Sequence, residues 1–124
     1  MFKIEKLIDA AKKRQKTIVF PEVSFSDRTV EAVKILQKKK IVKVLLVGDA
    51  SALILRDKIF EKFDIVNPVT FPDRAKLVKT LYEKRKEKGM TLEEADEIEK
   101  DPYYFATLLV ECGYADGMVA GAEA

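Results

Sequence analysis

Histidine is absent from the 124-residue sequence. Without histidine the chain has no imidazole base for a Ser-His-Asp triad, and a zinc site would have to be assembled from one cysteine and carboxylates. The composition therefore excludes hydrolysis by a histidine-based triad and makes a zinc centre hard to build.

Cysteine occurs once, as Cys112. A single cysteine excludes an internal disulfide framework and suits a reducing compartment, so we expect a cytoplasmic protein. Cys112 ends an apolar helical stretch beside Gly113. Because no histidine is present to activate its thiol, the sequence predicts a buried, inert side chain rather than a nucleophile.

Long hydrophobic runs and a strong charge of one sign are missing too. No segment approaches the ~20 apolar residues needed to span a bilayer, and the first residues include Glu5 and Asp9, unlike a secretory signal. The net charge is +2, from 23 basic and 21 acidic residues. We therefore expect neither a membrane nor a nucleic acid as a partner.

Helical and strand patterns alternate along a length suited to one domain, residues 1–124. Short apolar, β-branched runs predict strands, and apolar residues at helical spacing predict helices. The predicted strands cover 17–20, 42–47, 65–66 and 115–121, and the predicted helices cover 2–16, 26–40, 50–63, 72–89, 91–100 and 101–113. This order predicts an α/β fold, with a parallel sheet and helices on both faces in a three-layer sandwich.

The carboxyl ends of parallel strands meet at one edge of a sheet, where ligands bind in α/β folds. That edge would receive Pro21-Glu22, Gly48-Asp49, Asn67-Pro68 and Gly121. Neither a P-loop nor a G-x-G-x-x-G motif follows a predicted strand, and Gly117 and Gly121 are more typical of close packing than of phosphate binding. The residues alone leave the chemistry at this edge open.

Three ordered motifs in the second half of the chain narrow the possibilities. They are Tyr82-Glu-Lys-Arg-Lys-Glu-Lys-Gly-Met-Thr91, Asp101-Pro-Tyr-Tyr-Phe-Ala106 and Ala115-Asp-Gly-Met-Val-Ala-Gly-Ala122, with further matches upstream at 18–22, 27–28 and 44–49. With these motifs the chain resembles the N-terminal portion of the phosphate acetyltransferase family, also called phosphotransacetylases. The resemblance covers essentially the whole chain.

This resemblance implies a two-domain acyltransferase in which residues 1–124 form an incomplete N-terminal α/β domain and one wall of the cleft. The implied reaction interconverts acetyl-CoA and phosphate with acetyl phosphate and coenzyme A. Coenzyme A is then a substrate, and no covalently bound cofactor is implied. The family's catalytic residues match positions beyond Ala124, so we expect the isolated chain to be inactive.

One binding residue follows from the resemblance. Arg85 matches an arginine that the family uses to hold coenzyme A, and a guanidinium suits a phosphate group. The residues by themselves allow a plainer interpretation, a solvated arginine on a basic helix face. The adjacent lysines are expected to be surface charges, and Tyr103 and Tyr104 are expected to pack in the core. No catalytic residue and no metal ligand is assigned.

Two positions depart from the family pattern. Ala120 stands where the family usually has serine, and Ala124 stands where it has histidine. Both changes fall where phosphate-binding groups would begin to assemble. Three alternatives stay open, namely a non-catalytic α/β binding or regulatory module, a subunit completed by a separate polypeptide, and a phosphate butyryltransferase-like fragment. Apolar surface around Met118 and Val119 predicts a homodimer or higher oligomer.

Overall fold

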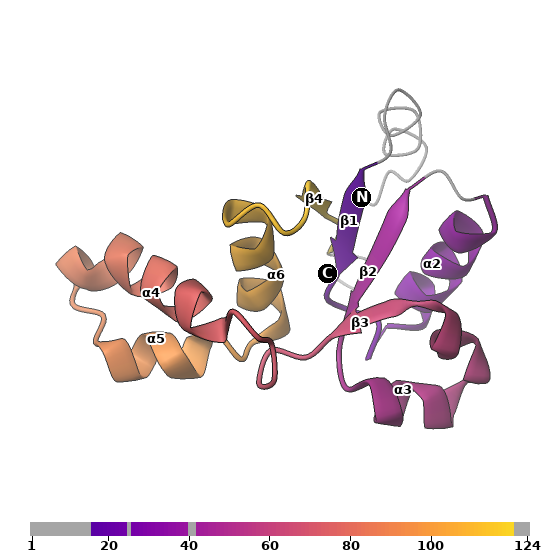
Figure 1. The fold of residues 1–124 in the computed structure, drawn as a ribbon, viewed down its shortest axis with the longest axis horizontal. Coiled ribbons are helices and arrows are strands. Elements are labelled where there is room, and N and C mark those ends of the chain that lie inside the picture. Colours follow the sequence, from indigo (N-terminus) through magenta and orange to yellow (C-terminus); the bar gives the residue numbers. More distant parts are fainter. Residues whose placement is uncertain (1–15, 25, 40–41, 121–124) are drawn as a thin grey trace.

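The computed structural model describes residues 16–24, 26–39 and 42–120 (Figure 1). Within these residues the strands form a four-stranded sheet in the order β3-β2-β1-β4, and every pairing is parallel. The strands are β1 (Thr17–Phe20), β2 (Lys43–Val47), β3 (Asp64–Val66) and β4 (Gly117–Met118). Ile18 pairs with Val44 on one side and with Gly117 on the other, which confirms the parallel sheet predicted from the sequence.

Helices cover both faces of this sheet, so the three-layer prediction is confirmed. They are α2 (Asp27–Lys39), α3 (Ala50–Arg56), η1 (Lys58–Lys62), α4 (Arg74–Arg85), η2 (Lys86–Lys88), α5 (Leu92–Ile98) and α6 (Pro102–Glu111). One face carries α2, α3 and η1. The other face packs against α6, while α4 and α5 form a hairpin that extends away from the sheet (Figure 1).

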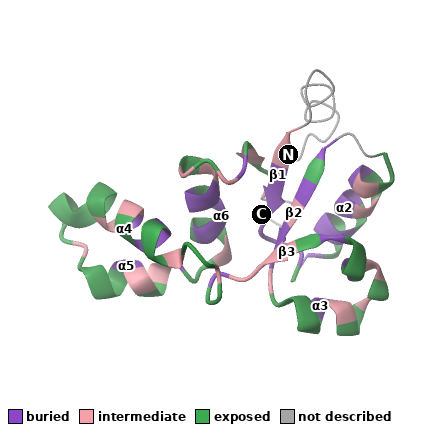
Figure 2. Ribbon diagram, viewed as in Figure 1, coloured by how far each residue is buried: buried purple, intermediate pink, exposed green. Residues whose placement is uncertain are grey.

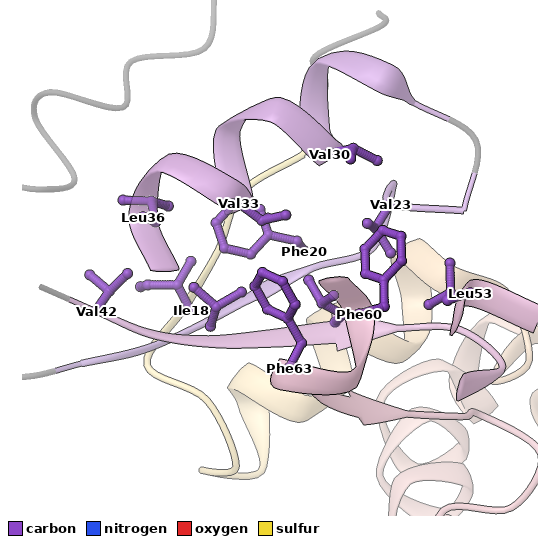
Figure 3. Packing of buried hydrophobic residues seen from close by; sticks show 12 residues of the cluster. Ile18, Phe20, Val23, Val30, Val33, Leu36, Val42, Leu53, Phe60 and Phe63 are labelled. Atoms are coloured by element: carbon purple, nitrogen blue, oxygen red, sulfur yellow. The ribbon is translucent and has the colours of Figure 1, made fainter. Parts of the chain in front are cut away.

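Strand residues divide between the two faces because side chains alternate along a strand. Phe20 and Leu46 are fully buried against Val33 and Leu36 of α2, with Phe60 of η1 in the same cluster (Figure 3). Burial of each such side chain contributes about 1.5–3 kcal/mol relative to exposure. This cluster fixes α2 and η1 against one face of the sheet.

The opposite face has a separate apolar cluster. Val19 and Val47 from the strands pack there with Leu77 of α4 and with Phe105 of α6. Phe71, from the segment that precedes α4, stacks edge-on against Phe105 with ring centroids 5.5 Å apart. The outer surfaces of α4 and α5 are largely exposed (Figure 2), and the residues that these two helices bury are Leu77, Val78, Leu81 and Ala95.

Several helices begin at local capping side chains. The Oγ of Ser26 accepts a 3.2 Å hydrogen bond from the Thr29 amide at the start of α2. Thr91 and Glu94 form a reciprocal capping box at the start of α5, and the Asp101 carboxylate caps α6 with Pro102 in its first turn. Such caps satisfy amide groups that have no partner inside the helix.

Three predicted elements have the wrong bounds. The strand predicted over 115–121 is formed only by Gly117–Met118 within the described residues. The continuous helix over 50–63 is interrupted at Asp57, whose extended backbone ends α3 while its carboxylate caps η1. The helix predicted over 72–89 starts at Arg74 and passes into η2 after Arg85. The predicted helix over 2–16 lies outside the described residues. In the described ranges, no helix is both long and apolar enough to cross a membrane.

Candidate functional site

The polar residues that follow β2 and β3 are occupied in local turns. Asp49 Oδ1 accepts a 3.1 Å hydrogen bond from the Ala52 amide and so caps α3. Asn67 Oδ1 accepts a 2.9 Å hydrogen bond from the Val69 amide. These side chains shape the carboxyl edge of the sheet, as expected of Asx residues at turns, rather than projecting free groups toward a ligand. Gly121, predicted at the same edge, lies outside the described residues.

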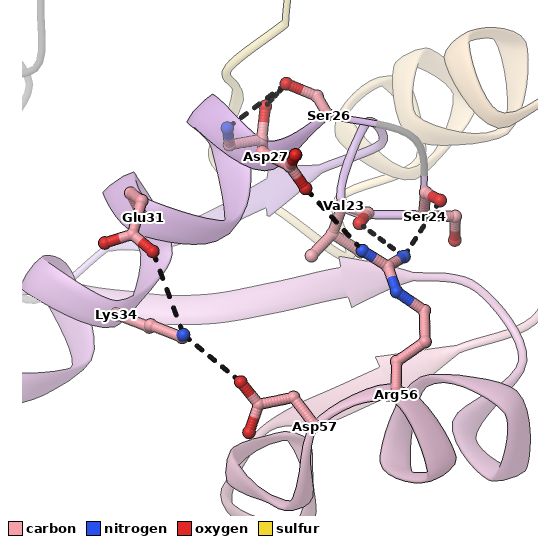
Figure 4. Close-up of polar contacts among 9 residues, drawn as sticks. Val23, Ser24, Ser26, Asp27, Glu31, Lys34, Arg56 and Asp57 are labelled. Atoms are coloured by element: carbon pink, nitrogen blue, oxygen red, sulfur yellow. Dashed lines mark hydrogen bonds and ion pairs between the residues drawn. The ribbon is translucent and has the colours of Figure 1, made fainter.

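The loop after β1 is held by Arg56 of α3. Its Nη1 donates to the carbonyl oxygen of Ser24 at 2.9 Å and lies 3.5 Å from that of Val23 (Figure 4). Its Nη2 lies 4.0 Å from the carboxylate of Asp27, the first residue of α2. One guanidinium thus ties the β1 exit loop to two helices, which uses the fork of donors that arginine supplies.

Glu22 lies in this same loop and is 1% exposed. The Tyr103 hydroxyl, at the start of α6, donates a hydrogen bond to Glu22 Oε2. This hydrogen bond and partial burial raise the pKa of Tyr103 to about 12. The carboxylate is therefore joined to α6 across the end of the sheet, and the phenol keeps its proton throughout the physiological range.

The expectation that Tyr103 and Tyr104 pack in the core is wrong, because they are 38% and 42% exposed. The core face of α6 is formed instead by Phe105 and Leu109, which are fully buried. Tyr104 belongs to a different face, which also presents Thr107, Leu108 and Glu111 at helical spacing. That spacing was the signal in the sequence that could have identified Tyr104 as a surface residue.

A small groove of about 170 Å³ lies between α4 and α6 and contains Arg85. Its lining residues are Leu81, Lys84, Arg85, Tyr104, Thr107, Leu108 and Glu111. The Lys84 ammonium pairs with the Glu111 carboxylate and so links the two helices. Arg85 is exposed in this groove, which places the predicted binding residue beside an aromatic ring and away from the turns that cap α3 and follow β3.

Charge pairing around the groove leaves Arg85 distinct from its neighbours. Lys84 is occupied by Glu111, and Lys86 lies 2.7 Å from the Glu83 carboxylate. The hydrogen bond between Lys86 and Glu83 raises the pKa of Lys86 and lowers the pKa of Glu83. Within the described part of the chain, the Arg85 guanidinium has no hydrogen bond or ion pair. An exposed, unpaired guanidinium can bind a phosphate in two-pronged fashion, and the Tyr104 ring beside it offers a surface for stacking.

The groove adjoins β4 through one residue of α6. Thr107 lines the groove, and its Oγ1 lies 3.9 Å from the Met118 sulfur in β4. The same hydroxyl donates to the carbonyl oxygen of Tyr103 at 2.9 Å. A single helix therefore carries both the groove wall and the side chain that reaches Glu22.

Arg74 and Glu99 form a second polar cluster, where α4 meets the end of α5. Arg74 Nη1 donates to Asp96 Oδ1 at 2.7 Å, and Arg74 Nε lies 2.9 Å from Oε1 of Glu99, which is 0% exposed. Burial raises the pKa of the Glu99 carboxyl despite Arg74, while Arg74 lowers the pKa of Asp96. This cluster joins the two arms of the α4–α5 hairpin and lies outside the groove.

Neither a metal nor a nucleophile is indicated by the described side chains. No group of three potential ligands among the cysteine, aspartate and glutamate residues of the described ranges could hold a metal ion. Cys112 is half-buried, with its Sγ 3.5 Å from Thr80 Oγ1, so it is less enclosed than the sequence predicts. Asp116 Oδ2 accepts a 2.8 Å hydrogen bond from the Thr17 amide, which gives it a structural role beside β1.

The parallel sheet, its two helical layers and the arginine-bearing groove define a three-layer α/β protein with a candidate site for an anionic ligand. The chain belongs to the phosphate acetyl/butaryl transferase family, whose model matches residues 2–124. Ala120, where the family resemblance predicts serine, is half-buried at the end of the described chain.

Relatives and solved structures agree with this family. The chain is 41% identical over 121 residues to a phosphate acetyltransferase of Acetivibrio thermocellus. This match covers 96% of the chain and 36% of the relative. It is also 38% identical to a phosphate acetyltransferase of Thermoanaerobacterium thermosaccharolyticum. That match covers 96% of the chain and 37% of the relative. A phosphotransacetylase structure from Streptococcus pyogenes has a TM-score of 0.79 at 32% identity, covering 97% of the chain and 38% of that structure. The chain thus spans little more than a third of the length of these proteins.

Proposed function

We propose that this chain supplies the N-terminal portion of an acyltransferase that interconverts acetyl-CoA and phosphate with acetyl phosphate and coenzyme A. Membership of the phosphate acetyl/butaryl transferase family supports the reaction. The names of the two relatives, both phosphate acetyltransferases, favour acetyl over butyryl transfer. Coenzyme A and acetyl phosphate are accordingly the proposed small-molecule substrates.

Within this function, Arg85 is the proposed coenzyme A ligand. The observation that carries this assignment is the unpaired guanidinium in the groove between α4 and α6, beside lysines that are already paired with glutamates. A phosphate group of coenzyme A would pair with this guanidinium. The adenine ring of the same molecule would have Tyr104 within the groove as a stacking partner.

Calorimetric titration of the chain with coenzyme A tests the role of Arg85. Arg85→Ala is expected to weaken binding about tenfold, since one charge-assisted contact is removed. Lys88→Ala is a matched control, because Lys88 is an exposed cation of the adjoining η2 that does not line the groove. Its binding should stay within about twofold of the unsubstituted chain. Equal affinities for Arg85→Ala and the unsubstituted chain would refute the assignment.

The 124-residue polypeptide by itself is proposed to bind without turnover. Acyl transfer between two substrates requires both to be held in a reactive geometry, and the Arg85 groove is the proposed site of only one of them. An assay of thioester formation from acetyl phosphate and coenzyme A checks this directly. Measurable turnover by the isolated polypeptide would contradict the proposal.

Self-association is proposed through the β4 edge of the sheet. Met118 is 38% exposed there, and β4 has a strand neighbour only on its β1 side within the described residues. Exposed apolar strand edges favour pairing with another chain. Sedimentation is expected to show a dimer, and Met118→Glu is expected to weaken this dimer. A monomer at high concentration would refute the proposed self-association. A cytoplasmic location, which rests on the single cysteine, remains a prediction.

A further inference from the structure

A second cavity, of about 680 Å³, lies on the opposite side of the sheet from the Arg85 groove. It opens between the last turns of α2 and the η1 segment. Its lining residues are Lys34, Gln37, Lys38, Asp57, Ile59, Lys62 and Phe63. The volume falls within the range typical of cavities that bind small molecules, so the chemistry of its walls decides what it would accept.

The Lys34 and Asp57 charges in this cavity are already paired. Lys34 Nζ lies 3.2 Å from Asp57 Oδ2 and 3.8 Å from the Glu31 carboxylate (Figure 4). The other oxygen of Asp57 accepts a 3.0 Å hydrogen bond from the Ile59 amide. Lys34 and Asp57 therefore hold α2 against the start of η1 and leave little unpaired charge for a ligand.

Lys38 and Lys62 differ from Lys34 in this respect. They line the cavity from α2 and from η1, and neither has an acidic partner in the described ranges. The Gln37 side chain donates from Nε2 to the carbonyl oxygen of Lys62 at 3.2 Å, which links the two walls. Two unpaired ammonium groups on linked walls favour a ligand with more than one negative charge.

Apolar side chains complete the cavity. Ile59 is half-buried, and Phe63 is 8% exposed and packs into the core cluster beneath (Figure 3). An apolar wall next to two cations suits a molecule with a charged end and an apolar body. Lysine binds phosphate as a point charge, and a phosphate monoester carries close to two negative charges at neutral pH.

We propose that this cavity is a binding site for a small organic phosphate, a phosphate monoester with an aromatic or aliphatic body. Lys38 and Lys62 bind the phosphate, and Ile59 and Phe63 contact the apolar body. The site is separate from the Arg85 groove, because its walls are α2 and η1 rather than α4 and α6.

Titration of the ¹⁵N-labelled 124-residue chain with phenyl phosphate, followed by amide chemical shifts, tests this site. We expect shifts at Gln37, Ile59 and Phe63, and about tenfold weaker binding of inorganic phosphate, which lacks the apolar body. The double variant Lys38→Gln/Lys62→Gln should weaken phenyl phosphate binding by about tenfold.

The matched control is Lys39→Gln/Lys58→Gln, which removes the same charge from exposed positions on α2 and η1 that do not line the cavity. The affinity of this control variant for phenyl phosphate should change by less than about twofold. Arg85→Ala should leave the affinity for phenyl phosphate unchanged. Absence of shifts at the cavity overturns the proposal. Equal weakening in the two double variants, or equal affinity for phenyl phosphate and inorganic phosphate, overturns it as well, because either result indicates attraction of anions to the basic surface in general.

Discussion

The hydroxyl of Tyr103 donates a hydrogen bond to the carboxylate of Glu22, 81 residues earlier in the chain. Glu22 follows β1 and is almost completely buried, whereas Tyr103 belongs to the first turn of α6 and is partly exposed. The contact therefore fastens α6 to the carboxyl edge of the sheet. Because α6 also forms one wall of the Arg85 groove, this fastening positions the groove relative to the strands.

Tyr103→Phe removes the hydroxyl and with it this hydrogen bond to the buried carboxylate of Glu22. Loss of a hydrogen bond to a charged group costs about 1.5–3 kcal/mol, so we expect urea denaturation to show a lower free energy of unfolding by about that amount. Tyr104→Phe is the matched control, since the Tyr104 hydroxyl has no hydrogen-bond partner in the described chain. It should change stability by less than about 0.5 kcal/mol. Equal effects of the two substitutions would show that the Glu22 contact contributes nothing.

Gly48 is packed closely at the exit of β2. A Cβ atom at this position would lie 2.9 Å from Ser24 Oγ and 3.0 Å from Leu53 Cδ1, and Leu53 is buried. Gly48→Ala is therefore expected to lower the free energy of unfolding by about 1–3 kcal/mol, the usual cost of overpacking. Urea denaturation measures the change.

Gly117→Ala provides the comparison for Gly48→Ala. A Cβ atom at Gly117 would meet only Ile18 Cδ1, at 3.4 Å, which is an ordinary van der Waals contact. We expect a cost below about 1 kcal/mol. A larger loss at Gly117 than at Gly48 would contradict this account of the two glycines.

Local signals explain which parts of the fold could be predicted from the sequence. The capping box of Thr91 and Glu94 and the Asp101 cap lie within three residues of the amides that they bind, so the sequence pattern contains them. The break at Asp57 was missed because the apolar spacing continues through it, and only the backbone conformation shows that this residue ends one helix and caps the next segment.

Contacts between distant residues could not be predicted in this way. Tyr103 binds the carboxylate of a residue 81 positions away, and nothing near either residue in the sequence indicates the other. Arg85 was assigned by family resemblance, but its unpaired state depends on Glu111 binding Lys84 across 27 residues. The packing of α4 against α6, rather than helix propensity, thus determines which charged side chains of the groove are paired.

Glu99→Gln is expected to change how stability depends on pH. Burial raises the pKa of the Glu99 carboxyl above its usual 4.5, with Arg74, Asp96 and Lys100 as the charges that act on it. The folded state then binds this proton more tightly than the unfolded chain, so the native protein loses stability through Glu99 as the pH rises from about 4.5 through the raised pKa. Glutamine does not titrate. The free energy of unfolding of Glu99→Gln, relative to the native chain, should therefore increase between pH 4.5 and pH 7.

Urea denaturation at several pH values checks the Glu99 prediction. Glu97→Gln serves as the control, because it removes an exposed carboxylate, paired with Lys100, from the same helix. The control should follow the pH dependence of the native chain. A relative stability of Glu99→Gln that is flat or falls across this range would refute the raised pKa.

Arg74→Met tests whether the same ion pair stabilises the α4–α5 hairpin. The substitution keeps an unbranched apolar side chain but removes the contacts to Asp96 and leaves the Glu99 carboxylate buried without its cation. Breaking a buried pair by removing one partner costs about 3–5 kcal/mol, and the partial exposure of Arg74 places our expectation near the lower value, about 3 kcal/mol.

Much of that cost should arise from the stranded charge rather than from lost attraction, which a double-mutant cycle separates. In a Glu99→Gln background no buried charge remains, so Arg74→Met should cost about 1–2 kcal/mol less than in the native chain at pH 7. In a Glu97→Gln background, where the buried carboxylate is intact, it should cost the same as in the native chain. If Arg74→Met costs the same in all three backgrounds, the interaction of Arg74 with Asp96 alone stabilises the hairpin, and Glu99 contributes only through its burial.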